Sequence, residues 1–166
     1  KDIAIKGLKA EQIYCKDNSG KIICDNVTWV QDSGYTFSKG AFDVLNNLVM
    51  AGDAKRFVFK SNRPFTIKSG AYMSCEQGFE FAYQPASVSR TLFNFEDSTA
   101  TLRLNAATLS STATGLQLTK GKVVIEDTCY LQSAATYKAE GIVFGDGTSA
   151  TNNVTIDVLP EATLNL

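Results

Sequence analysis

Residues 27–37, with the sequence VTWVQDSGYTF, can be laid over residues 57–67, FVFKSNRPFTI, without a gap. In both stretches apolar residues stand two apart on either side of a polar turn, so that Trp29 matches Phe59 and Phe37 matches Ile67. Apolar residues with a period of two are typical of strands with one buried face. Each stretch therefore predicts two strands joined by a turn, and the repetition favours a coil of similar units.

A short phrase follows both stretches and recurs further along the chain. It consists of an apolar residue, two mostly polar residues, a fourth residue that is often small, a small residue and further apolar residues. The copies begin at Phe37, Ile67, Leu104, Ile125 and Val158, so the spacing between them is uneven. A phrase that is kept while its spacing varies predicts an irregular coil with loops between fixed corners. The small residues are expected to stack at one shared corner, where a tight bend leaves no room for a long side chain: Ala41, Ala71, Thr108, Cys129 and Ala162.

Three strands in each turn of roughly 20–35 residues predict an all-β fold, a right-handed parallel β-helix of about five rungs over residues 27–166. A β-sandwich or jelly roll of about ten strands is the alternative. After the first corner, Ala41, Asp43 and Leu45 are expected to point inward, although Asp43 fits such a position poorly. Residues 41–50 also have helical spacing, with Gly52 as a possible C-cap, so a helix or an irregular strand there is an alternative to the third strand.

Residues 1–26 differ from the rest and are expected to cap the coil or to act as a strand-exchange segment. The turn signal Asp17-Asn18-Ser19-Gly20 lies between two apolar pairs and predicts a hairpin. The hairpin would make a disulfide between Cys15 and Cys24 possible, with two buried thiols as the alternative. Cys75 and Cys129 are expected two rungs apart, roughly 9–10 Å, and therefore to remain buried free thiols.

The composition excludes several classes of function. The 16 basic and 17 acidic residues are nearly balanced, which argues against a nucleic-acid partner. The chain contains no histidine, the commonest general base and metal ligand, so that neither a cofactor nor a metal is expected. No apolar run is long enough for a membrane span. Because the chain starts at Lys1, either a leader has been removed, which implies export, or the chain is a fragment.

The C-terminal half resembles right-handed β-helix surface proteins of bacteria, such as autotransporter passengers and adhesins. The resemblance is carried by residues 115–125, 141–147 and 154–166, and extends as a pattern over residues 27–166. It implies export to the cell surface or the extracellular space, an extended coil, and a role in adhesion or surface structure. It implies no catalytic residues.

Polysaccharide lyases and hydrolases also use β-helices, and they need clustered carboxylates with basic residues on one outward face. Arg103, Glu126 and Asp157 come from successive predicted rungs and could share such a face. A solvated sheet face of mixed charge explains the same residues, and we favour that interpretation. A carbohydrate-active enzyme remains an alternative hypothesis.

Three other patterns have structural explanations. Gly145-Asp146-Gly147 occurs once, whereas a calcium-binding β-roll repeats such units, so a turn is expected. Asn26 and Asn153 stand in N-glycosylation patterns, which matter only in a host that glycosylates. Nine aromatic residues could form a sugar-binding stripe, but their alternation favours the core: Trp29, Tyr35, Phe37, Phe57, Phe59, Phe65, Phe79, Phe81 and Tyr83.

The ends of the coil give the leading functional hypothesis. Residues 162–166 form an alternating strand, and an uncovered last rung would expose unpaired backbone groups and apolar layers. We therefore expect copies of the chain to stack head to tail into a filament or fibre, as a non-catalytic structural protein of a surface layer. An adhesin or stalk fragment that binds surface glycans or a host protein is the alternative. The candidate contact residues are Ile3, Ile5, Leu8, Leu164 and Leu166.

Overall fold

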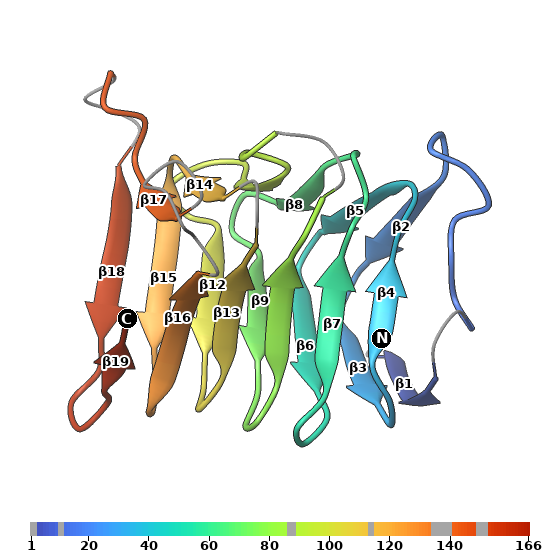
Figure 1. Ribbon diagram of the computed structural model, residues 1–166, viewed down its shortest axis with the longest axis horizontal. Coiled ribbons are helices and arrows are strands. Elements are labelled where there is room, and N and C mark those ends of the chain that lie inside the picture. The colour runs from blue at the N-terminus through green and yellow to red at the C-terminus, as the bar shows by residue number, and fades with distance from the viewer. Residues whose placement is uncertain (1–2, 10–11, 86–88, 113–114, 134–140, 149–152) are drawn as a thin grey trace.

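The computed structural model of the chain is a parallel β-solenoid of about five turns (Figure 1). It describes residues 3–9, 12–85, 89–112, 115–133, 141–148 and 153–166, and these residues form nineteen strands and no helix. In Figure 1 the six-stranded sheet runs upward on the near side and the seven-stranded sheet runs downward on the far side, while the chain advances from right to left. The coil is therefore right-handed, as the sequence predicts.

The seven-stranded sheet extends along the whole coil. All its neighbouring strands are parallel, so that each inner-face residue stacks on a residue of the next turn. Its strands in spatial order are β1 (Ile3–Leu8), β3 (Val27–Gln31), β6 (Asn47–Ala51), β9 (Tyr72–Cys75), β12 (Thr101–Leu104), β15 (Gly121–Ile125) and β18 (Val154–Val158).

Two further faces complete each turn. The six-stranded sheet contains β4 (Tyr35–Phe37), β7 (Arg56–Phe59), β10 (Glu80–Tyr83), β13 (Thr108–Ser111), β16 (Cys129–Ser133) and β19 (Leu164–Asn165). The third face consists of a four-stranded sheet, β2 (Lys21–Cys24), β5 (Ala41–Val44), β8 (Phe65–Ile67) and β11 (Phe93–Phe95), and of the pair β14 (Leu116–Leu118) and β17 (Ile142–Phe144).

The length of a turn varies, and the register of the seven-stranded sheet measures it. Val27 pairs with Leu48, Leu48 with Met73, and Met73 with Leu102, so the second and third of these turns are each longer than the one before. The next turn, from Leu102 to Val123, is as short as the turn from Val27 to Leu48, and the turn from Val123 to Ile156 is the longest in the sheet. A regular stack with loops of different length between the strands agrees with the sequence prediction and excludes the sandwich alternative.

Aromatic rings fill the core of the first four turns. The rings of Phe42 and Phe65 stack with centroids 4.5 Å apart, and the ring of Phe57 stacks on Tyr35 at 5.5 Å and on Phe81 at 5.6 Å. All nine aromatic residues of the predicted stripe are at most 1% exposed, so the core interpretation is confirmed and the sugar-binding stripe is wrong. Leucines and isoleucines replace the rings in the later turns.

The superposition of residues 27–37 on residues 57–67 does not correspond to stacking. The first stretch supplies β3 and β4, whereas the second supplies β7 and β8, which belong to different pairs of sheets. Val27 stacks on Leu48, not on Phe57. The physical reason is that apolar alternation has the same period in all three sheets, so the pattern identifies strands without assigning them to a sheet.

The five small residues therefore do not share one corner. Ala41 lies in β5 of the four-stranded sheet, Ala71 precedes β9, and Ala162 precedes β19. Thr108 pairs with Tyr130 rather than with Cys129. The single small-residue column is a wrong prediction.

Residues 41–50 form β5 and β6, so the helical alternative is wrong. Phe42 and Val44 are fully buried in β5, whereas Leu45 is 40% exposed. The predicted inward positions are thus displaced by one residue. The carboxylate of Asp43 is ion-paired with Lys21 Nζ at 2.8 Å, which explains how it is tolerated.

The hairpin prediction for the N-terminal region is also wrong. β2 pairs in parallel with β5, and β1 pairs in parallel with β3, so the strand pairing of the coil begins at Ile3 rather than at Val27. Cys15 and Cys24 are free, because no hairpin brings them into opposite strands. Cys15 instead lies against Gly40, where an added Cβ atom would come within 2.5 Å of its sulfur.

Cys75 and Cys129 are both buried and free. The Cys129 thiol donates a hydrogen bond to the carbonyl of Leu104 at 3.1 Å, and Leu104 stacks on Cys75 in the seven-stranded sheet. Burial in this apolar interior raises the pKa of the Cys75 thiol, so it remains protonated.

Candidate functional site

The residues suggested for an enzyme lie on the outer face of the seven-stranded sheet, where each carboxylate has its own cation. Arg103 Nε lies 2.8 Å from Glu126 Oε1, and Lys122 Nζ lies 2.8 Å from Asp157 Oδ2. The Arg103 guanidinium also lies over the ring of Tyr72, 5.5 Å from its centroid. This arrangement is a set of cross-strand ion pairs of the kind that stabilises and solubilises a sheet face.

Neither metal motif nor membrane span is found in the described part of the chain. No group of three or more histidine, cysteine, aspartate or glutamate residues there could hold a metal ion. Gly145 and Gly147 have positive φ angles, and Asp146 accepts the amide hydrogen bond of Thr148 at 2.9 Å, as in a turn. The described residues also contain no helix with the length and apolarity that crossing a membrane requires.

The two glycosylation patterns lie in different surroundings. Asn26 is half-buried between β2 and β3 with φ at 57°, and its amide donates to Asp25 at 3.1 Å. Asn153 is exposed just before β18.

The inner face of the seven-stranded sheet contains two continuous rows of stacked side chains. The first row is Ile3, Val27, Leu48, Met73, Leu102, Val123 and Ile156; the second row is Ile5, Trp29, Met50, Cys75, Leu104, Ile125 and Val158. Every member between β3 and β15 is at most 6% exposed.

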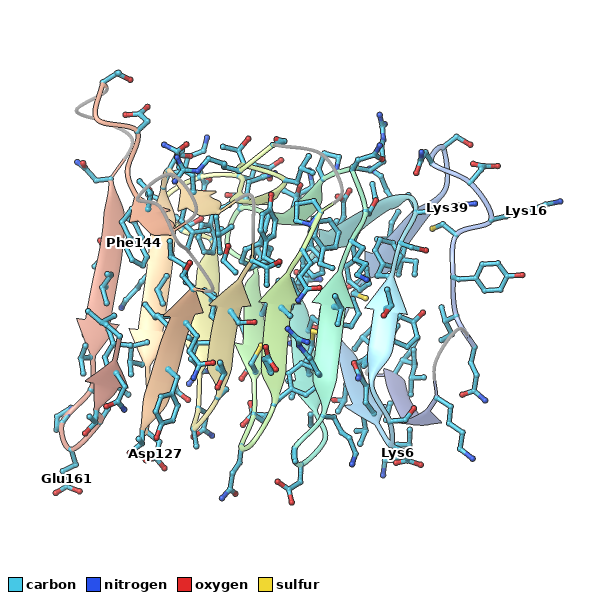
Figure 2. The ribbon with its side chains drawn as sticks, in the orientation of Figure 1. Lys6, Lys16, Lys39, Asp127, Phe144 and Glu161 are labelled. Carbon is cyan, nitrogen blue, oxygen red and sulfur yellow. The ribbon has the colours of Figure 1, made fainter. Side chains whose placement is uncertain are left out.

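At the N-terminal end the rows finish on β1. Ile3 is 55% exposed, and Ile5 is half-buried against the core. Leu8 pairs with Gln31 after a shift in register, and its side chain lies outside the described part. Residues 12–20 pass over the rest of this end, where Ile13 and Cys15 pack against the core. Figure 2 shows Lys16 projecting from this end, away from the coil.

At the C-terminal end the rows finish on β18. Ile156 is 40% exposed and Val158 is 45% exposed, although their stacking partners Val123 and Ile125 are fully buried. Leu164 of β19 stacks on Cys129 and is half-buried, and Leu166 is 95% exposed. A cavity of about 540 Å³ opens beside Leu166, Ile142 and Phe144, and Figure 2 shows Phe144 at this end of the coil.

The two ends form the candidate functional site. The structure gathers the predicted Ile3 and Ile5 at one end and Leu164 and Leu166 at the other. Sequence reasoning missed Ile156 and Val158, because their exposure follows from their position on the last strand of a row. Alternation within residues 154–158 was the available signal, but only the register assigns those residues to the same rows as Ile3 and Ile5.

The fold and its two ends define the class of the protein, a parallel β-solenoid with a layered apolar interior. Comparison of the chain with protein-family models, with curated proteins and with solved structures gives no match.

Proposed function

We propose that the protein is a non-catalytic structural subunit that assembles end to end into a filament, through pairing of β18 of one copy with β1 of the next. The observation that supports this proposal is the continuity of the two rows. A β1 strand placed on β18 in the same register sets Ile3 on Ile156 and Ile5 on Val158. Both contacts repeat the stacking found between all neighbouring strands of the seven-stranded sheet.

The free strand edges favour the same contact. Among the described residues, β1 has β3 as its only strand neighbour and β18 has β15. An unpaired edge presents N–H and C=O groups that another strand can bind. Completing the burial of a half-exposed isoleucine or valine contributes about 1 kcal/mol. Burial of Ile3, Ile156 and Val158 would therefore add to the stabilisation that the backbone hydrogen bonds give the contact.

The charge of the chain is compatible with assembly. A formal net charge of −1 produces little repulsion between copies. The contact joins two different surfaces, so it does not close on itself and continues as a linear polymer. The resemblance of the C-terminal half to β-helix surface proteins supports an exported filament or adhesive layer as the setting.

Two lysine substitutions test the contact. Ile3→Lys and Ile156→Lys each place a charge at one end of the coil. We expect each variant to be monomeric at concentrations at which the unmodified chain forms linear oligomers. Sedimentation velocity measures the oligomers and electron microscopy shows their form. Thr155→Lys is the matched control, because it adds the same charge to the outer face of β18 and should leave assembly intact.

Mixing the two variants makes the test sharper. Ile3→Lys retains an intact β18 and Ile156→Lys retains an intact β1, so an equimolar mixture should form dimers and nothing longer. The proposal is wrong if the unmodified chain remains monomeric at every concentration, or if the mixture behaves as monomers while each variant keeps the fluorescence of buried Trp29.

A further inference from the structure

A groove of about 440 Å³ is lined by residues of the six-stranded sheet and reaches the C-terminal end of the coil at Leu166. Ser110 of β13 pairs with Gln132 of β16, and Glu80 begins the neighbouring strand β10. Arg56 of β7 and the exposed side chain of Leu166 complete the part of the lining that matters here.

The charges in the groove compensate each other. Arg56 Nε lies 3.0 Å from Glu80 Oε1, and the Ser110 hydroxyl donates a hydrogen bond to the same oxygen. The Arg56 and Glu80 side chains are 43% and 29% exposed, so the pair is partly withdrawn from water. One cation and one anion in contact leave no net charge to attract an ionic ligand.

Hydrogen-bonding capacity nevertheless remains. Among the described residues, the contacts of Glu80 are made through Oε1, and no hydrogen bond is found for the exposed side-chain amide of Gln132. The carboxylate oxygen is a strong acceptor, and the amide supplies two donors and one acceptor. Adjacent hydroxyl groups, each both donor and acceptor, match that set. Leu166 adds an apolar surface beside it.

We propose that this groove binds a neutral saccharide. Glu80 and Gln132 would bind neighbouring sugar hydroxyls, while the C–H face of the ring packs against Leu166. The volume lies within the range of small-molecule sites, about 300–1,000 Å³, and suits a short oligosaccharide. The inference goes beyond filament assembly, because Glu80 and Gln132 lie in β10 and β16, whereas the proposed filament contact joins β1 and β18.

The test uses the Ile156→Lys variant, so that assembly does not affect the measurement. A panel of neutral oligosaccharides, comprising maltotriose, cellotriose, triacetylchitotriose and mannotriose, is titrated with amide chemical shifts and calorimetry as readouts. An acidic trisaccharide, trigalacturonate, is the comparator. We expect at least one neutral member to bind saturably and to shift the amides of β10, β13 and β16.

Two substitutions locate the binding. Gln132→Ala and Glu80→Gln should each weaken the affinity for that saccharide at least tenfold, whereas Asn47→Ala, an amide removed from the outer face of the seven-stranded sheet, should not change it. Because Gln132→Ala breaks no contact described above, it remains informative even if Glu80→Gln destabilises the sheet. Binding of the acidic trisaccharide alone, binding by none of the five, or unchanged affinity of Gln132→Ala would overturn the proposal.

Discussion

Phe65 occupies the centre of the aromatic core, and its replacement by leucine tests how far ring contacts stabilise the coil. Its side chain is fully buried in β8. Five other rings surround it, those of Phe42, Phe57, Phe59, Phe81 and Phe93, with centroids 4.5 to 6.5 Å away.

Phe95 is the matched control. It lies in β11 on the same face of the coil, is 2% exposed, and among the described residues contacts one ring, that of Phe93 at 6.0 Å. Leucine replaces the same volume at both sites, so the transfer and cavity contributions are similar. The difference between the two variants therefore reports the four additional ring pairs around Phe65.

The expected difference follows from the energy of one pair. An aromatic pair contributes about 0.5–1.5 kcal/mol beyond its buried area, so four independent pairs would contribute about 2–6 kcal/mol. The pairs share a single ring and are not additive, which favours the lower end of that range. We expect Phe65→Leu to lower the free energy of unfolding by about 2 kcal/mol more than Phe95→Leu.

Urea unfolding followed by fluorescence measures this difference, because the single tryptophan, Trp29, is 1% exposed and lies 6.1 Å from both Phe42 and Phe57. Circular dichroism must give coincident transitions, since a stacked coil can unfold in parts. If the two variants agree within about 0.5 kcal/mol, the ring contacts do not contribute beyond volume and the reasoning is refuted.

Three further predictions concern the glycines, the thiols and one carboxyl. Gly121→Ala should lower the free energy of unfolding by about 1–3 kcal/mol more than Gly70→Ala. Both glycines have positive φ, but only at Gly121 would an added Cβ lie within 2.5 Å of the Phe95 ring. Equal melting temperatures of the two variants would contradict this prediction. A thiol reagent should label the half-buried Cys15 alone in the native protein and all four cysteines in denaturant, and Cys15→Ser should abolish the native reaction. The other thiols are buried, and burial raises the pKa of Cys24 to about 12, so rapid labelling of a second thiol would oppose the prediction. Hydrogen bonds from Ser69 and Thr99 lower the pKa of Asp97 from 3.8 to about 2, so the contribution of this carboxylate to stability should be complete above about pH 4 and fall as the pH decreases towards 2. Asp97→Asn should flatten that part of the pH profile of the melting temperature, and an unchanged profile would count against the prediction.

The strands could be predicted from the sequence because apolar alternation is a local signal. It located β3, β4, β7 and β8 within a residue or two. The sheet to which each strand belongs could not be predicted, because Val27 and Phe57 alternate in the same way although they face the core from different sides. The length of the loops decides to which sheet a strand belongs, and loops have no periodic sequence pattern from which that length could be predicted.

The N-terminal error has a related cause. The turn at Asp17 is present, since its carboxylate accepts the amide of Ser19 at 2.9 Å, and the strand Lys21–Cys24 follows it. The partner of that strand, however, is Ala41–Val44, not the residues just before the turn. A turn signal specifies a change of direction, whereas the pairing partner depends on the whole coil.

The candidate sites show the same limit. Ile3, Ile5, Leu164 and Leu166 could be proposed as end residues because of their places in the chain. The groove could not be found, because Arg56, Glu80, Ser110 and Gln132 come from four successive turns and no short motif contains two of them.

The variation in turn length has a consequence for the evolution and engineering of the chain. The long turn from Val123 to Ile156 and the short turn from Leu102 to Val123 contribute strands to the same three faces, so the difference in length lies between the strands. Added residues in such a loop need not alter the register of neighbouring turns. New peptides can therefore be inserted between strands one at a time, while the stacked strands and the spacing of the turns along the axis stay constant.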